Sequence, residues 1–356
     1  MSTAPSPSDI PVIDISSPSP DVAQQVLTAA STHGFLFIKN DGVTIPPADI
    51  DAMFQLSREF FHQPREEKAE YAIHSEKAGG INCGWVSMQG ESLDPEGQKQ
   101  GDPKEAFNIS PPQAPHNPLQ PLPPTLASSS DLLSRFQTAC RTLCLAILSL
   151  LGTALQIPDS EGGSTYFTTR HDPYLDPSGT IFRMLYYPRT VSTSRNENGE
   201  GDETSIRAGA HSDYGSLTLL FRLPGQPGLE ILTTSQTWVP VPVNPSPSTL
   251  PEPPILVNIG DLLSFWTNGM LKSTVHRVTF CGGEERYSMA YFCHPRDEVL
   301  LGAVPSKVIE GFGSKGEEEL RGQRRRLGLD EAGEGKGGVL TARQHLDRRL
   351  KVTYGL

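Results

Sequence analysis

The sequence predicts a mainly β protein with helical support, an α+β chain built around a β-sandwich or jelly-roll barrel. From about residue 181 to residue 292, short runs of β-branched and aromatic residues alternate with Gly and Pro, which is typical of strands and turns. Helical patterns lie mainly before this region, where they can form a layer over one sheet. With 356 residues, 36% of them hydrophobic, the chain can bury a substantial core.

The first third of the chain is predicted to mix strands and helices. Residues 1–9 are rich in Pro and Ser and are expected to be disordered. The N-terminal region, 10–110, is predicted to contain a strand over 11–15, a helix over about 21–33, a strand over 34–38 and a helix over about 48–62 that ends before Pro64. Residues 111–129 are rich in Pro and Ser, which indicates a linker.

A long amphipathic helix is predicted over 130–156, with Ser130 or Asp131 as its N-cap, because apolar residues recur there at helical spacing. This support helix and a connection make up the segment 130–176. The remaining divisions are the strand-rich core, 177–298, and a C-terminal segment, 299–356, with a Gly- and charge-rich stretch at 311–338 before a last helix.

The net charge disfavours some classes of binding partner, and the cysteines indicate the cellular compartment. A net charge of −11 leaves no general basic surface, which disfavours binding to nucleic acid or to an anionic membrane. The most apolar stretch, 143–155, is too short to span a bilayer, and the N-terminus lacks the pattern of a signal peptide. Five cysteines without a C-x-x-C motif predict reduced thiols and a cytoplasmic location, with Cys140 and Cys144 on one buried helical face.

Two histidines and one aspartate form the candidate metal site. His211 and Asp213 form a His-x-Asp motif before an apolar run, and His276 lies in a second strand-like segment, STVHRVTF. In an extended chain, side chains two residues apart share a face, so His211 and Asp213 can reach one ion. Two imidazoles and one carboxylate are the ligands of non-haem Fe(II) oxygenases, which leave metal positions open for substrate and O2.

A bare His-x-Asp motif is a weak indication, since it arises readily by chance. The chain contains a second copy, His345-Leu346-Asp347, in a polar stretch with leucines at helical spacing. No histidine follows it, so we interpret this copy as the solvated face of the C-terminal helix. A lone histidine such as His276 would more often be a core residue, and only its combination with His211 and Asp213 predicts a metal site.

Arg286 and Ser288 form a candidate carboxylate site. They lie two residues apart in a predicted strand, so both side chains point the same way. A guanidinium fork with a neighbouring hydroxyl suits a carboxylate. Residues 276–280 and 286–292, separated by the Gly-containing segment 281–285, predict a β-hairpin that puts this pair on the strand beside His276.

Together with these motifs, several segments resemble the iron- and 2-oxoglutarate-dependent dioxygenases of the isopenicillin N synthase-like group. IPVIDIS and HGFLFIKNDGV resemble the opening strand and the first helix-to-strand junction, GDPKEAFNI a segment before the core, and RMLYYP the strand that enters the barrel. VNIGDLLSFWTNGMLKSTVHRV, which includes His276, follows the family pattern throughout. The resemblance covers roughly residues 10–110 and 130–300, and it implies a double-stranded β-helix (jelly-roll) core.

The resemblance also implies Fe(II), 2-oxoglutarate and O2 as reacting components, with a small organic molecule as substrate. The distal carboxylate of 2-oxoglutarate would meet Arg286 and Ser288, with Tyr187 as a third contact, although Tyr187 could instead be a barrel-wall aromatic. Oxidation of a substrate C–H bond, by hydroxylation, desaturation or cyclisation, would accompany release of succinate and CO2. Leu185 stands where several plant relatives carry Asn, so their contacts cannot all be transferred.

Alternatives stay open at this point. Isopenicillin N synthase and the ethylene-forming plant oxidase resemble this chain in both iron ligands and Arg-x-Ser, yet they do not use 2-oxoglutarate. A catalytically silent binding protein and a protein-modifying hydroxylase are the others, although the intact ligands and the long N-terminal region favour a small-molecule enzyme. The polar insertion 189–208 is expected to face solvent, with a lid over the barrel mouth as the alternative. Substrate and oligomeric state are not indicated by any motif.

Overall fold

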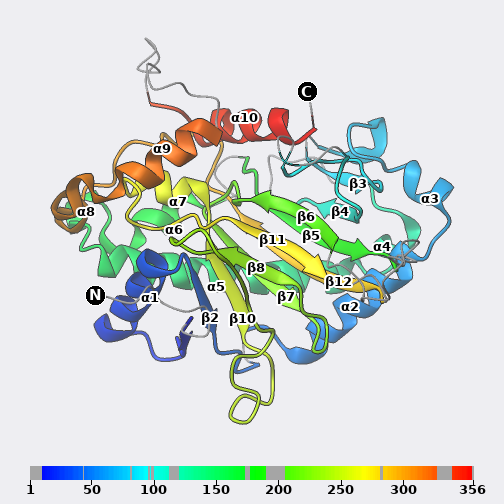
Figure 1. The fold of residues 1–356 in the computed structure, drawn as a ribbon, viewed down its shortest axis with the longest axis horizontal. Coiled ribbons are helices and arrows are strands. Elements are labelled where there is room, and N and C mark those ends of the chain that lie inside the picture. The colour runs from blue at the N-terminus through cyan, green and yellow to red at the C-terminus, as the bar shows by residue number, and fades with distance from the viewer. Residues whose placement is uncertain are drawn as a thin grey trace, which may run out of the picture.

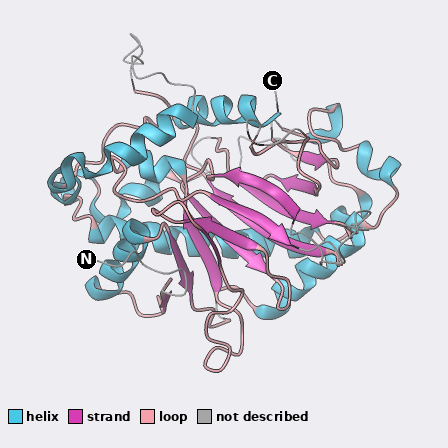
Figure 2. Ribbon diagram, viewed as in Figure 1, coloured by secondary structure: helices cyan, strands magenta, loops and turns pink. Residues whose placement is uncertain are grey.

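The computed structural model shows two β-sheets that face each other, with helices packed around them (Figure 1, Figure 2). The residues that it describes are 10–42, 44–80, 82–94, 97, 100–111, 120–172, 177–189, 205–280, 284–326 and 339–354, so the N-terminus 1–9 lies outside them. The larger sheet has the strand order β1-β2-β10-β7-β12-β5-β4-β3, and the smaller has the order β6-β11-β8-β9. This architecture confirms the predicted jelly-roll core with helical support.

The N-terminal region supplies half of the strands of the larger sheet. These strands are β1 (Val12–Ile13), β2 (Phe35–Ile38), β3 (Gly84–Val86) and β4 (Glu105–Ile109). The pair β1 and β2 lies beside β10 at one edge, while β4 and β3 lie beside β5 at the other edge. The region 10–110 and the core therefore share one sheet. The sequence pattern predicted β1 and β2 but not β3 and β4.

Two helices of the N-terminal region lie at their predicted positions. They are α1 (Pro20–Thr32), whose N-cap Ser19 accepts a hydrogen bond from Val22 N at 3.2 Å, and α2 (Pro47–Phe61). Short helical turns follow at α3 (Arg65–Ala69) and η2 (Glu76–Ala78). Both α1 and α2 pack against the long helix α5, so the N-terminal helices form one layer with it.

The helix α5 (Ser130–Ala154) is the predicted support helix, and it packs against β7 and β12 of the larger sheet. Its buried side chains include the thiols of Cys140 and Cys144, as predicted. By length and composition the whole helix could cross a membrane, although the stretch 143–155 by itself is shorter than such a span. However, 56% of its most apolar 18-residue window is buried inside the protein, and packing against the sheet accounts for that apolar face.

The connections on either side of α5 are more helical than predicted. The short helix α4 (Pro124–Ala127) lies within the predicted linker 111–129, of which 112–119 fall outside the described residues. Because α4 leads almost directly into α5, the N-cap is Ser129, without a side-chain cap, rather than Ser130 or Asp131. After α5, the chain reaches the core through η3 (Asp159–Glu161), η4 (Gly163–Thr165) and α6 (Tyr166–Arg170).

Strands dominate the core, as predicted. They are β5 (Ile181–Tyr187), β6 (Ser205–His211), β7 (Leu217–Arg222), β8 (Leu229–Leu232), β9 (Trp238–Pro240), β10 (Ile255–Ile259), β11 (His276–Phe280) and β12 (Arg286–Cys293), with α7 (Asp261–Trp266) between β10 and β11. The start of β6 lies in the expected insertion 189–208, of which 190–204 fall outside the described residues. Alternate residues of β5 and β7, such as Phe182 and Phe221, face α5, where both rings contact Phe136. The other face of the larger sheet is directed at the smaller one.

The predicted hairpin of β11 with β12 is wrong. β11 pairs with β6 and β8 in the smaller sheet, whereas β12 pairs with β5 and β7 in the larger sheet. The short connection between them therefore crosses from one sheet to the other, as connections in a jelly roll do. As a result, Arg286 faces His276 across the gap between the sheets instead of lying beside it.

The C-terminal segment contains more helix than its composition indicates. Its elements are α8 (Lys307–Phe312), η5 (Gly313–Gly316), α9 (Glu317–Arg326) and the predicted last helix α10 (Ala342–Tyr354). The Gly- and charge-rich stretch 311–338 is thus helical in its first half, and 327–338 fall outside the described residues. Figure 1 shows α10, in red, at the top of the view, above β6.

Replacing Phe136 by Ala tests the packing of α5 on the larger sheet. The ring is 1% exposed and lies 5.4 Å from Phe182 and 5.1 Å from Phe221, centroid to centroid. We expect Phe136→Ala to lower the free energy of unfolding by about 3–5 kcal/mol, measured by urea denaturation, because it leaves a cavity. The exposed Thr138→Ala on the same helix should change it by less than about 0.5 kcal/mol, and equal losses in the two variants would contradict the packing.

Candidate active site

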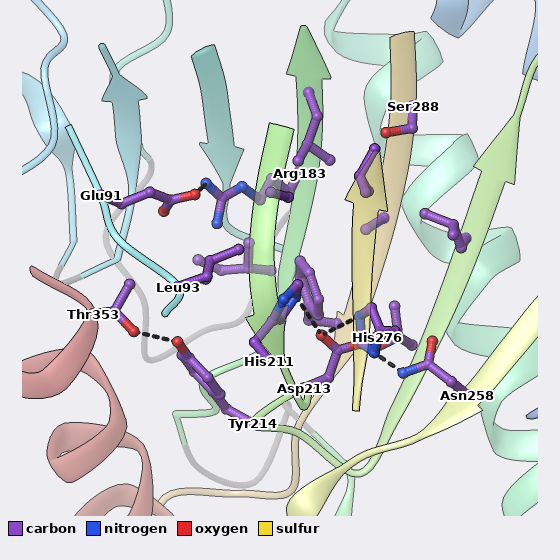
Figure 3. Close-up of a pocket in the computed structure, with 18 of the residues that line it drawn as sticks. Glu91, Leu93, Arg183, His211, Asp213, Tyr214, Asn258, His276, Ser288 and Thr353 are labelled. Atoms are coloured by element: carbon purple, nitrogen blue, oxygen red, sulfur yellow. Dashed lines mark hydrogen bonds and ion pairs between the residues drawn. The ribbon is translucent and has the colours of Figure 1, made fainter. Parts of the chain in front are cut away.

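Three potential metal ligands converge between the two sheets (Figure 3). His211 ends β6 and His276 begins β11, and these two residues are direct partners in the strand pairing. Asp213 follows just beyond β6. Nε2 of His211 lies 3.8 Å from Oδ1 of Asp213, and Nε2 of His276 lies 3.6 Å from the same oxygen. All three ligand atoms lie within 4.8 Å of one another, so one ion can contact all of them.

Hydrogen bonds hold the carboxylate of Asp213 in this orientation. Its Oδ2 accepts one bond from Thr218 Oγ1 on β7 and one from Asn258 Nδ2 on β10, both at 2.6 Å. Burial raises the pKa of Asp213, but the two imidazoles and these two hydrogen bonds outweigh it and hold the pKa below its usual value. The carboxylate is therefore ionised at neutral pH, and Oδ1 is directed at the histidines.

Both imidazoles present Nε2 to the carboxylate because Nδ1 is engaged elsewhere. Nδ1 of His211 lies 2.7 Å from Gly209 O, and Nδ1 of His276 lies 3.2 Å from Thr274 O. A proton on each Nδ1 donates to these carbonyls and leaves the Nε2 lone pairs for a metal. Burial and the nearby His276 lower the pKa of His211 to about 4. Two imidazole nitrogens and one ionised carboxylate on one side fit Fe(II).

Tyr187, Arg286 and Ser288 come together on the larger sheet. Arg286 is the register partner of Tyr187, and Ser288 lies two residues further along β12, so all three side chains project from the inner face. Arg286 Nε donates to Pro227 O at 3.0 Å, Nη1 lies 3.3 Å from Ser288 Oγ, and the guanidinium carbon lies 5.0 Å from the Tyr187 ring centre. The structure therefore brings the predicted carboxylate-binding residues together.

One cavity connects these residues to the metal ligands. Its volume is about 1040 Å³ when the space of its open mouth is included. Apolar side chains line much of it, among them Leu93, Leu185, Leu220 and Phe292. The cavity is thus mainly apolar between two groups of converging polar side chains.

A buried ion network, which the sequence patterns did not reveal, lines another part of this cavity. Glu91 Oε1 lies 2.5 Å from Arg183 Nη2 and 2.9 Å from Lys104 Nζ, and Lys104 also contacts Asp102 Oδ2 at 2.6 Å. Burial raises the pKa of Glu91, but the two cations outweigh it and lower that pKa. Two carboxylates balance two cations, so the network of Glu91, Asp102, Lys104 and Arg183 has no net charge.

Only one member of this network could have been found from the sequence. Arg183 precedes Leu185 and Tyr187 at two-residue spacing on β5, so strand periodicity alone assigns it to the inner face. Glu91 lies in an irregular segment, and Tyr354, whose hydroxyl lies 3.3 Å from Glu91 Oε2, comes from the end of α10. Only the folded chain brings those two residues together.

The helix α10 contributes to the cavity wall through Leu346, Leu350 and Thr353. The Thr353 hydroxyl is hydrogen-bonded to Tyr214, next to Asp213 (Figure 3). The predicted exposure of His345 is therefore wrong: this residue is 1% exposed, because the face of α10 that carries it packs inward. Its partner Asp347 instead forms an ion pair with Arg343 at 2.7 Å, and this second His-x-Asp copy does not join the metal-ligand cluster.

Comparisons with known families agree with the geometry. Residues 179–295 match the 2OG-Fe(II) oxygenase superfamily, and residues 10–143 match the N-terminal region described as non-haem dioxygenase in morphine synthesis. The first match contains all three candidate metal ligands together with Tyr187, Arg286 and Ser288. The two matches together cover the strands of both sheets, the helices α1 and α2 and the first part of α5.

Full-length relatives extend this similarity. The chain is 33% identical to the UPF0676 protein C1494.01 of Schizosaccharomyces pombe over 98% of this chain and 93% of that protein. It is 30% identical to the proline hydroxylase buaE of Petromyces alliaceus over 83% of this chain and 88% of that protein. A full-length Neurospora crassa protein, solved in complex with alpha-KG, superposes with a TM-score of 0.71 and 26% identity, over 96% of this chain and 95% of that chain.

These matches select among the alternatives that the sequence left open. Relatives named as 2-oxoglutarate-dependent dioxygenases, such as traH of Penicillium crustosum, which is 28% identical over 82% of this chain, favour 2-oxoglutarate as co-substrate. The intact cluster of His211, Asp213 and His276 fits an active enzyme rather than a silent binding protein. The chain belongs to the family of iron- and 2-oxoglutarate-dependent dioxygenases, non-haem enzymes that use Fe(II), 2-oxoglutarate and O2 to oxidise small organic molecules.

Proposed function

We propose that His211, Asp213 and His276 bind the catalytic Fe(II) and that Tyr187, Arg286 and Ser288 bind the distal carboxylate of 2-oxoglutarate. The convergence of the three ligand atoms within 4.8 Å carries this proposal. The co-substrate would extend across the gap between the sheets, from the ligands on the smaller sheet to Arg286 on the larger one. When bound, Fe(II) and 2-oxoglutarate supply the oxidising chemistry, with release of succinate and CO2.

The residues of this chain would bind the metal and the co-substrate, hold them in position and exclude water from the cavity. Asn258 and Thr218 fix the carboxylate of Asp213, so the ligand set is organised before the metal arrives. Arg286 is 3% exposed, which strengthens its interaction with a carboxylate relative to the same pair in water. The apolar part of the cavity keeps bulk water away from the reacting C–H bond.

We further propose that the substrate is a small neutral metabolite that binds against the ion network formed by Glu91, Asp102, Lys104 and Arg183. The cations of this network are already neutralised, so it offers hydrogen bonds rather than net charge. Arg183 Nε is buried without a hydrogen-bond partner among the described residues, so it can donate to a substrate carbonyl. Another complex of the same Neurospora crassa protein contains thymine, a neutral heterocycle, which supports this class.

Hydroxylation is the proposed default reaction, because desaturation or cyclisation needs a second reacting position on the substrate. A role in secondary metabolism agrees with relatives such as the clavatol oxidase claD of Penicillium crustosum, 31% identical over 76% of this chain. We also propose a cytoplasmic location, which the buried free thiols of Cys83, Cys140, Cys144 and Cys293 support.

Replacing His276 by Ala tests the metal assignment. We expect the purified variant to lose most of its bound iron, because one of three protein ligands is missing. Iron content after anaerobic loading and desalting provides the measurement. Asp347→Asn, in the second His-x-Asp copy, is the matched control and should retain iron. Equal iron content in His276→Ala and the parent protein would refute the assignment.

Anaerobic titration of the Fe(II)-loaded protein with 2-oxoglutarate tests the co-substrate assignment. A visible metal-to-ligand charge-transfer band is expected in the parent protein. In Arg286→Gln we expect the apparent Kd for 2-oxoglutarate to rise by roughly 10- to 100-fold, because a charged fork is lost, while iron content stays unchanged. A parent protein that binds iron without this band would instead indicate an oxidase that does not use 2-oxoglutarate.

Coupled succinate release tests the proposed substrate class. Among matched pairs of metabolites that differ by an amide or a carboxylate, we expect turnover of the neutral member. For such a substrate, Arg183→Met should raise KM by roughly 10-fold or more, because a buried hydrogen bond is lost, while the Kd for 2-oxoglutarate stays within about 2-fold. A substrate that requires its own carboxylate would contradict the proposal.

A further inference from the structure

A second buried guanidinium, that of Arg222, lies on the same sheet face as the residues assigned to the distal carboxylate. Arg222 at the end of β7 is the register partner of Ser288 on β12. Register partners project to the same face of a sheet, as do residues two apart on one strand. Arg222, Ser288 and Arg286 therefore all project from the inner face of the larger sheet.

No carboxylate neutralises Arg222 among the described residues. Its Nη1 donates to Val241 O at 2.9 Å and its Nη2 to Pro242 O at 2.7 Å, and its side chain lies over the ring of Phe37. Burial and the nearby Arg286 lower the pKa of Arg222 to about 9, so the group keeps its charge at neutral pH. The residue is only 7% exposed, so solvent screens this charge weakly.

Two carboxylates that share a smaller cavity with Arg222 do not change this balance. Asp51 and Glu252 line a smaller, separate cavity together with Arg222, but both are exposed and neither forms an ion pair with it. Arg286 also contacts no carboxylate among the described residues; its bonds go to Pro227 O and to Ser288. Two buried cations thus lie near each other, and no anion within the described part of the chain compensates them, an unfavourable arrangement for the unliganded protein.

The two cations of the ion network near the proposed substrate site differ from Arg222 and Arg286 in being neutralised. There, Lys104 and Arg183 are both paired with buried carboxylates at 2.5 to 2.9 Å. The described region around Arg222 and Arg286 instead keeps an excess of positive charge. A ligand that carries a carboxylate at this end of the cavity would supply the missing negative charge.

We infer that Arg222 is a positioning residue that makes the site selective for 2-oxo acids with a distal carboxylate. Arg222 does not line the main cavity, so it acts through its electric field and through Arg286 rather than by direct contact. The inference rests on the proposed binding of 2-oxoglutarate to Arg286 and Ser288. It predicts that removal of the Arg222 charge weakens the binding of ligands with a distal carboxylate and leaves the binding of ligands without one unchanged.

The test compares 2-oxoglutarate with 2-oxopentanoate, which has the same 2-oxo acid head but no distal carboxylate. Both are titrated anaerobically into Fe(II)-loaded Arg222→Met, Arg222→Lys and parent protein, by the charge-transfer band and by the shift in Tm. In Arg222→Met we expect 2-oxoglutarate to bind roughly 5- to 50-fold more weakly, the size expected for one partly buried charge. The Kd of 2-oxopentanoate should change by less than about 2-fold, since it lacks the interacting group.

The variants separate this role from a structural one. Arg222→Lys keeps the charge and should bind 2-oxoglutarate more tightly than Arg222→Met. If Arg222→Met does not fold, Arg222→Gln, which can still donate to the carbonyl of Val241, takes its place. An equal loss of both ligands, or an unchanged Kd for 2-oxoglutarate, would overturn the inference. A parent protein that does not bind 2-oxoglutarate at all would overturn the proposed function instead.

Discussion

The division of the active site between two facing sheets is the constraint on which the rest of the structure depends. His211 and His276 are held together by the pairing of β6 with β11 in the smaller sheet. Arg286 and Ser288 are held by the pairing of β12 with β5 and β7 in the larger one. The distance between the two groups is set by sheet packing, about 10 Å in such folds, so a co-substrate attached at both ends must span the gap.

The distribution of charge along the cavity follows from this arrangement. Burying an uncompensated charge is costly, and the chain avoids that cost on the substrate side by pairing Lys104 and Arg183 with Glu91 and Asp102. At the far end of the larger sheet, the guanidinium of Arg286 is left without a carboxylate among the described residues. The two ends therefore differ in net charge, which supports the proposed placement of a dicarboxylate co-substrate at one end and a neutral substrate at the other.

The helices have separate roles on the two sides of the sheets. On the outer face, α5 and the N-terminal helices bury the apolar side of the larger sheet. At the cavity, α10 joins Tyr214 through Thr353 and joins Glu91 through Tyr354. The substrate-side wall thus comes from segments remote from the metal ligands, so it can differ among relatives without disturbing the chemistry at the metal.

Local pattern predicted the pair of His211 and Asp213, the Arg-x-Ser pair and the long helix α5, because each depends on spacing along one short segment or one helix. His276 joined the candidate ligands only through its strand-like context and the order of the motifs along the chain. The same reasoning failed for the strand pairing of β11 and β12, since a short Gly-containing connection can close a hairpin or cross between sheets. Only the tertiary structure decided between a hairpin and a crossing, because β11 pairs within the smaller sheet and β12 within the larger one. It also decided that Glu91 and Tyr354 meet and that His345 is buried, because contacts between distant segments leave no periodic trace in the sequence.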